Sequence, residues 1–330
     1  ALELEVGSLD IERWYSNREH RALINFGSSA GHIPARMKVM NDSGSFLPVG
    51  DAAHRKATDR EINEMIRIIE KGLSDGGLAV GLGLQYTPAA SRTEVIEVFR
   101  LASRYNAVCH VHIRGMGPVE NIGGVEALQE VIASALVSGA PLHVVHISSS
   151  GLSVTEQLLE LVGQAREKGL DITTECYPYT AGMSGIQSAI FDEGWQERIG
   201  IGYDSLTWPE TGETLTATSF AKYRKQQGMV VIHFIPKQSM DTAVTSPLTA
   251  IATDGYLRNG AGHPRTAGTY AKLLGHYVRK TKKLDMMEAL RKSALMPAQR
   301  LEVRAPAFKK KGRIRVGADA DLAIFDPQVV

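Results

Sequence analysis

The fold is decided by residues 250–265, which read AIATDGYLRNGAGHPR. Asp254 follows a short apolar run at 248–252 and precedes a glycine, so a carboxylate is expected at the C-terminal tip of a strand. Enzymes built on parallel β/α barrels keep their chemistry at that end of their strands. Arg265 lies in a His-Pro-Arg sequence just before a predicted helix, and it is therefore expected near the same end.

Predicted strands and helices alternate along most of the chain. Buried strands separated by helices of about a dozen residues are typical of parallel βαβ units. A stretch rich in Gly, Thr and Ser, residues 182–228, interrupts the alternation and is interpreted as a loop over the active-site face. The strands are predicted at 78–84, 108–114, 142–148, 171–177, 229–235 and 248–252, and the helices at 58–72, 92–105, 124–137, 154–168, 269–280 and 284–292.

This alternation predicts the α/β class. We expect a TIM-like (β/α)8 barrel in residues 1–303 and a small appended β element in residues 304–330. The last segment contains GADAD, which is interpreted as a tight turn between two short strands.

Composition limits the function classes. The chain has 330 residues, 43% of them hydrophobic and 22% charged, as expected of a soluble globular enzyme. Its 37 basic and 36 acidic residues leave no basic excess for nucleic acid, and no apolar run approaches the ~18 residues of a membrane span. Two cysteines cannot form a disulfide framework, which favours a reducing compartment and a cytoplasmic location.

Histidines on neighbouring strands suggest a metal site. A catalytic zinc takes nitrogen, oxygen or sulfur ligands and keeps one position open for water, and a nearby carboxylate can move that water's proton. His112 and His146 end neighbouring strands and are candidate ligands, and Asp254 is the candidate proton carrier. The structural alternative, a core histidine bonded to a backbone carbonyl, is preferred for His110 and His143.

Several stretches match one family along almost the whole chain. They are GHIPARMKVM (31–40), EINEMIRIIEKGLSDGGLAVGLGLQYTP (61–88), HIR (112–114), VVHIS (144–148), YPY (177–179), TDG (253–255), HPRTAGTYAKLLGHYVR (263–279) and the segment 297–327. Through them the chain resembles the N-acyl-D-amino-acid deacylases (D-aminoacylases) of the amidohydrolase superfamily. The 263–279 stretch is fairly specific to this group, whereas GADADLAIFD is shared by amidohydrolases generally.

The resemblance implies a zinc cofactor and a role for each matching residue. His112 and His146 are expected to be zinc ligands from the fifth and sixth barrel strands. Asp254, after the eighth strand, is expected to act as the general acid/base that activates the metal-bound water. Arg265 is expected to bind the α-carboxylate of the substrate through its planar pair of donors. Two tyrosines are expected to line the pocket and donate hydrogen bonds to the substrate, Tyr86 and Tyr177.

Two departures from the family pattern affect these expectations. The deacylases carry His-x-His on the first strand and a ligand cysteine on the next, and neither Cys109 nor Cys176 fits that context. The chain is therefore expected to be truncated at both ends and its barrel to lack the first two strands. Ser148 also occupies the position where the deacylases place a lysine, and its surroundings favour the hydantoinase and dihydroorotase branch.

The sequence therefore predicts zinc-dependent hydrolysis of the amide bond of N-acyl-(D-)amino acids. The alternatives are a cyclic amidase of the hydantoinase or dihydroorotase type and a catalytically incomplete fragment. The expected partner is a small N-acyl-amino acid, with no nucleic acid and no membrane. The sequence does not specify the acyl group, the side chain or the stereochemistry of the substrate. Whether the chain forms a homo-oligomer also stays open.

Overall fold

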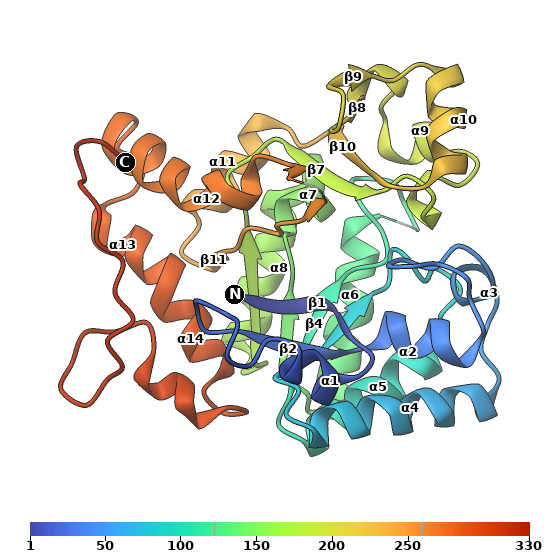
Figure 1. The fold of residues 1–330 in the computed structure, drawn as a ribbon, viewed down its shortest axis with the longest axis horizontal. Helices are drawn as coiled ribbons and strands as arrows, with labels where there is room; N and C mark the ends of the chain where they lie inside the picture. Colours follow the sequence, from blue (N-terminus) through green and yellow to red (C-terminus); the bar gives the residue numbers. More distant parts are fainter. Residues whose placement is uncertain (122, 259) are drawn as a thin grey trace.

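The computed structural model describes residues 1–121, 123–258 and 260–330. Its central feature is a seven-stranded parallel sheet in the order β1-β2-β3-β4-β5-β6-β11, with helices packed around it (Figure 1). The predicted α/β class is thereby confirmed. The strands are β1 (Leu2–Ser8), β2 (Gly27–Gly31), β3 (Ala79–Gly83), β4 (Val108–His112), β5 (Leu142–Val144), β6 (Ile172–Cys176) and β11 (Thr249–Ile251).

Each predicted helix is found near its expected position, and further helices surround the sheet. Thr58 and Glu61 form a capping box at the start of α4 (Asp59–Ser74), because each side chain accepts a hydrogen bond from the other residue's backbone N–H. The remaining helices around the sheet are α1 (Ile11–Ser16), α2 (His32–Val39), α3 (Asp51–His54), α5 (Arg92–Arg104), α6 (Gly124–Ser138), α7 (Ile147–Gly151), η1 (Leu152–Val154), α8 (Thr155–Glu167), α11 (Lys237–Thr245), α12 (Arg265–Lys272), η4 (Leu273–Lys280), α13 (Met286–Leu290), η5 (Arg291–Leu295) and α14 (Met296–Leu301).

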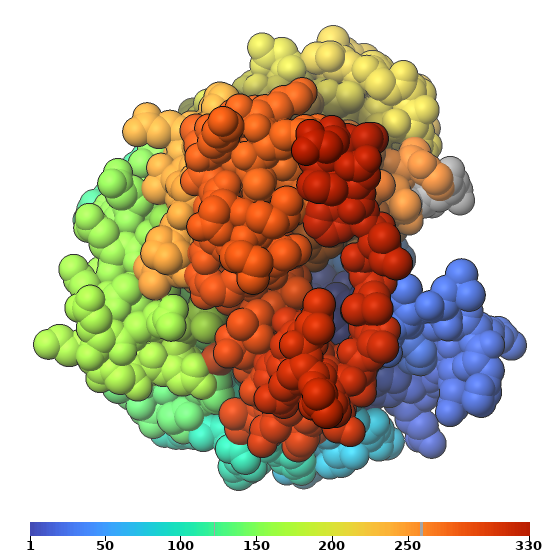
Figure 2. Space-filling view, turned by 90° about the vertical axis from the view of Figure 1, so that its left-hand side faces the viewer, coloured from blue at the N-terminus to red at the C-terminus, as the bar shows by residue number. Residues whose placement is uncertain are grey.

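The sheet contains two parallel strands that the sequence analysis does not predict, β1 and β2. Strand β1 pairs with β2, and its backbone also passes close to β3, because a side chain at Gly81 would collide with the carbonyl oxygens of Leu4 and Glu5. Within the described residues no ladder joins β11 to β1, so the sheet keeps two edges. Figure 2 shows atoms of the N-terminal residues, in dark blue, set back behind the red C-terminal segment.

The segment interpreted as a loop is in fact a second sheet. Residues 181–233 contain the antiparallel strands β7 (Ala181–Gly185), β8 (Leu206–Trp208), β9 (Glu213–Thr214) and β10 (Met229–His233), ordered β7-β10-β8-β9. Between them lie η2 (Ala189–Phe191), α9 (Trp195–Ile199), η3 (Tyr203–Ser205) and α10 (Ala217–Gln226). The predicted strand at 229–235 therefore belongs to this sheet and not to the barrel, since an apolar run does not specify its partner. We call residues 181–235 the insertion.

Residues 304–330 contain no strand. They form a 3-10 helix, η6 (Pro306–Lys310), followed by irregular chain in which apolar side chains such as Ile314, Val316 and Ile324 are almost fully exposed. The expected β element is therefore absent from this segment, because alternating apolar residues form a strand only where a partner strand is available. A domain division at residue 303/304 stays a prediction.

A short hairpin of β12 (Leu257–Arg258) and β13 (Ala261–Gly262) follows the end of β11.

Of the helices that the structure describes, none is both long and apolar enough to cross a membrane.

Candidate metal centre and active site

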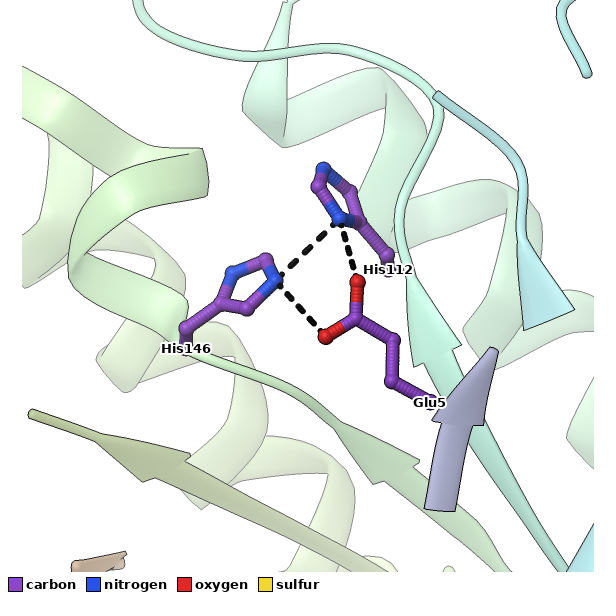
Figure 3. Close-up of side chains that lie close together, drawn as sticks. All are labelled: Glu5, His112 and His146. Carbon is purple, nitrogen blue, oxygen red and sulfur yellow. Dashed lines mark hydrogen bonds and ion pairs between the residues drawn. The ribbon is translucent and has the colours of Figure 1, made fainter. Parts of the chain in front are cut away.

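Three side chains from three parallel strands meet at one end of the sheet. Glu5 comes from β1, His112 from the last position of β4, and His146 from the turn after β5 (Figure 3). His112 Nδ1 lies 2.9 Å from Glu5 Oε1 and 3.2 Å from His146 Nε2, and His146 Nε2 lies 3.5 Å from Glu5 Oε2. Tetrahedral zinc ligands stand ~3.4 Å apart around one ion. The spacing and the donor set of two imidazoles and a carboxylate therefore fit zinc.

The backbone around His146 serves to aim its ring. His146 lies in the left-handed region with φ of 33°, which is costly for a residue with a side chain and is concentrated at functional sites. Its Nδ1 lies 2.8 Å from the hydroxyl of Ser149 in α7, and that hydroxyl also lies 2.9 Å from the His146 carbonyl oxygen. A histidine that binds metal through one nitrogen usually donates a hydrogen bond through the other. Ser149 is placed to accept that bond and to leave Nε2 directed at Glu5.

Without a metal, the opposite charges of Glu5 and His146 hold this group together. Burial alone raises the pKa of Glu5, but His146 and His112 outweigh burial and hold it well below its ordinary value. Burial lowers the pKa of His146, but the Glu5 carboxylate outweighs it and raises that pKa to about 9. Burial and the neighbouring His146 lower the pKa of His112. Near neutral pH the group is therefore a Glu5 carboxylate, a charged His146 and a neutral His112.

Asp254 and Arg265 form an ion pair beside this group. Asp254 follows β11 with φ of 43°, and its Oδ2 lies 2.8 Å from Arg265 Nη2. Burial raises the pKa of Asp254 to about 6, although the Arg265 charge acts in the opposite direction. A carboxylate that titrates near neutral pH suits general acid/base work. The structure thus places the predicted proton carrier in a suitable environment.

Arg265 is buried with two unused donors. Its side chain is 2% exposed, and its guanidinium lies 4.3 Å from the ring centre of Tyr177. In the described part of the chain, Nε and Nη1 have no hydrogen-bond partner. Buried guanidinium donors without partners are energetically costly, so they indicate a place for an anionic ligand.

All six residues singled out from the sequence border one cavity. Its lining includes Tyr86, His112, His146, Tyr177, Asp254 and Arg265. The Tyr86 ring centre lies 4.9 Å from that of His112. Burial raises the pKa of Tyr86, and it raises that of Tyr177 to about 12, so both phenols keep their protons. The insertion covers this cavity with side chains from β7, β10 and their flanks, Met183, Ser184, Ile232 and Phe234. The structure thus brings the six predicted site residues together around one cavity. Their catalytic roles stay predictions.

Glu5 is the site residue that sequence reasoning missed. A signal for it existed, because Leu2, Leu4 and Val6 alternate with acidic residues, as in a strand with one buried face. The predicted strands do not include this segment, and its carboxylate is therefore not among the predicted site residues. In the deacylase pattern the strand following the His-x-His strand carries a ligand cysteine. In this chain β1 lies next to β2 in the sheet and provides a carboxylate, Glu5, that points toward the two histidines.

A second buried polar pair lies one layer deeper between β5 and β6. His143 Nε2 lies 3.1 Å from Glu175 Oε2, and His143 Nδ1 lies 2.7 Å from Thr173 Oγ1. Burial lowers the pKa of His143 to about 3 and raises that of Glu175 to about 7. Around pH 6 both groups are therefore neutral, and their 3.1 Å contact carries no ion-pair charge. This agrees with the structural role expected for His143.

We expect Glu175→Gln to change the pH dependence of stability. The folded protein holds the Glu175 proton to a pH of about 7, whereas the unfolded chain releases it near 4.5. The free energy of unfolding therefore falls as pH rises through that window, and glutamine removes this loss. The variant should gain about 1–2 kcal/mol over the parent at pH 8 and nothing at pH 4.5. Urea unfolding at both pH values measures this, with Glu167→Gln on the exposed face of α8 as control. An equal difference at both pH values contradicts the assignment.

Comparison with known proteins gives the family. The amidohydrolase family pattern matches residues 20–330. A D-aminoacylase from Alcaligenes xylosoxydans xylosoxydans is 26% identical, covering 99% of this chain and 66% of the relative. An N-acyl-D-glutamate deacylase from the same organism is 24% identical, covering 94% of this chain and 62% of the relative. The chain thus spans about two thirds of the length of these curated relatives.

A solved structure shares the fold. The N-acyl-D-glutamate deacylase from Bordetella bronchiseptica, complexed with zinc and a phosphonate mimic of the tetrahedral intermediate, matches with a TM-score of 0.78. The identity is 21%, and the match covers 96% of this chain and 66% of that one. Since the family pattern extends over nearly the whole chain, the resemblance seen in the sequence is confirmed: this chain belongs to the amidohydrolase family.

Proposed function

We propose that this chain hydrolyses the linear amide bond of N-acyl-amino acids, of D configuration, in a zinc-dependent reaction. One observation carries the proposal. A zinc-type ligand group, a carboxylate with a pKa near neutrality and a buried arginine with free donors border a single cavity. The similarity to D-aminoacylases and N-acyl-D-glutamate deacylases supports this substrate class.

Glu5, His112 and His146 would hold the ion. When bound, zinc supplies a Lewis acid that polarises the amide carbonyl and lowers the pKa of water to ~7. Asp254 then acts as the proton carrier. Its Oδ2 is engaged by Arg265, so Oδ1 is the oxygen that accepts the proton of the attacking water and returns it to the leaving nitrogen.

Arg265 would fix the orientation of the substrate. Its Nε and Nη1 donors suit the two oxygens of an α-carboxylate, while Nη2 keeps Asp254 in place. Tyr86 and Tyr177 border the same cavity as protonated phenols and are placed to donate to the substrate. Positioning of this kind lowers the entropic part of the barrier.

A substrate panel tests the proposal. Zinc content is measured first, and the chain is then assayed with N-acetyl-D-amino acids, their L enantiomers and 5-substituted hydantoins. We expect about one zinc per chain and release of free D-amino acid from the first set. Turnover confined to hydantoins would favour the cyclic amidase, and no turnover in the zinc-loaded chain would overturn the proposal.

Arg265→Lys tests the carboxylate role. We expect KM for an N-acyl-D-amino acid to rise roughly 10- to 100-fold with a smaller change in kcat, because lysine lacks the paired donors. Steady-state kinetics with the corresponding N-acyl-D-amino acid amide provides the control, since that neutral compound has no carboxylate to lose. Equal losses with both compounds would mean that Arg265 acts only by positioning Asp254.

A further inference from the structure

The cavity at the metal centre is too small for the proposed substrate. Its volume is about 30 Å³, about the space of one water molecule. Met183 and Phe234 of the insertion cover it from above. Most of an N-acyl-amino acid must therefore lie outside this space.

A much larger cavity adjoins it. Its volume is about 460 Å³, within the range of ~300–1,000 Å³ typical of small-molecule sites. The two cavities share Met116, Ile190 and Ile199, so these three apolar side chains form the junction between them. The larger cavity includes none of the ligand histidines, and nothing in the proposed chemistry uses it.

The position of the larger cavity relative to Arg265 indicates which part of the substrate would occupy it. Its walls come from the segments after β3 and β4, from α6, and from η2 and α9. Arg265 begins α12, after β11, and borders only the small cavity. Since β5 and β6 separate β4 from β11 in the sheet, the two regions lie on opposite sides of the centre. With the α-carboxylate at Arg265, the acyl group faces the larger cavity.

The apolar part of the lining begins at the junction and favours an apolar acyl group. Polar side chains also line the cavity, among them Gln85, Asn121, Glu126 and Asp192. Apolar side chains at the junction and beyond it include Met116, Val119, Ala127, Ile190 and Ile199. The charge of Arg114 is neutralised by Glu130, with Nε–Oε2 at 3.0 Å and Nη2–Oε1 at 2.8 Å. Arg198 donates to the carbonyl oxygens of residues 190, 192 and 193. The third arginine of the lining, Arg92, is mostly exposed, and its Nη2 lies 3.6 Å from Glu130 Oε2. All three guanidinium groups therefore have protein oxygens nearby.

We infer that this cavity is the acyl subsite and that the substrate carries a medium-length apolar acyl group larger than acetyl. The inference rests on the proposed function. An acetyl group reaches little beyond the junction, whereas a hexanoyl chain extends into the cavity. Each fully buried methylene contributes about fourfold to binding, so the four extra methylenes of a hexanoyl group are expected to tighten binding by up to roughly 250-fold relative to acetyl.

The test compares acyl length at a constant amino acid. Calorimetry measures the dissociation constants of N-acetyl-, N-butyryl- and N-hexanoyl-D-leucine. The same three acyl groups are tested on D-glutamate. For both amino acids, kcat/KM is measured with zinc bound. We expect both quantities to improve with acyl length. Equal binding of all three acyl groups overturns the inference and leaves the proposed function standing. No binding of any N-acyl-amino acid overturns both.

Variants that fill the cavity locate the effect. Ala127→Phe places a ring into the cavity from α6, and Ala189→Leu reduces its volume from η2. Either should remove the advantage of hexanoyl over acetyl while acetyl binding stays within about twofold. Ala133→Phe on the exposed side of α6 is the matched control. Thermal unfolding shows whether each variant folds. If one variant fails to fold, the binding data of the other variant test the location of the acyl subsite. A hexanoyl advantage that persists in a folded, filled variant overturns the location.

Discussion

Asp254→Asn is expected to lower kcat for amide hydrolysis by about 10³-fold while the zinc content stays unchanged. General acid/base groups typically contribute ~10²–10⁴-fold, and asparagine cannot carry the proton. The Arg265 partner keeps an oxygen acceptor in the variant, so substrate affinity should change little. Steady-state kinetics together with elemental analysis measures both quantities.

The same residue sets the expected pH profile. Burial raises the pKa of Asp254 to about 6, and the general base must be deprotonated. In the parent, kcat/KM is therefore expected to rise with pH through about 6 and to level off above it, and this limb should disappear in Asp254→Asn. Asp204→Asn, at an exposed position in the insertion, is the control. Retention of full activity by Asp254→Asn would assign the proton transfer to another group.

Glu5→Gln is expected to weaken zinc binding by more than about 100-fold. Substitution of groups that merely support a ligand typically lowers affinity 10- to 100-fold, and Glu5 is placed to contact the ion itself. The neutral amide also removes the charge that draws the ion between the two histidines. A competitive chelator titration of the metal-free protein measures this, with Glu3→Gln on the same strand as matched control.

Zinc binding should also depend on pH in a way that Glu5 controls. The Glu5 carboxylate raises the pKa of His146 to about 9, so zinc must displace a proton from that ring. Affinity in the parent is expected to increase with pH between 6 and 8. Without the carboxylate the His146 pKa falls, and the pH dependence should become weaker. Unchanged affinity in Glu5→Gln would show that a different ligand set holds the metal.

The sequence by itself determined the repeating β/α elements and the candidate chemistry. Helical spacing and caps locate α4, α5 and α6 within one or two residues, because these signals act over a few neighbouring positions. Polar residues just after apolar runs mark the C-terminal ends of strands. His112, His146 and Asp254 are therefore visible without a structure.

Only the tertiary structure decided which strands are neighbours and which charges face each other. The apolar run 229–235 gives no indication that it pairs with β7, and residues 304–330 have strand-like alternation but no partner strand. Glu5 is 107 positions from His112 in the chain. The two meet because β1 pairs with β2 at the edge of the sheet and its backbone passes close to Gly81 of β3. Strand pairing and charge contacts depend on distant segments, and local sequence patterns do not contain that information.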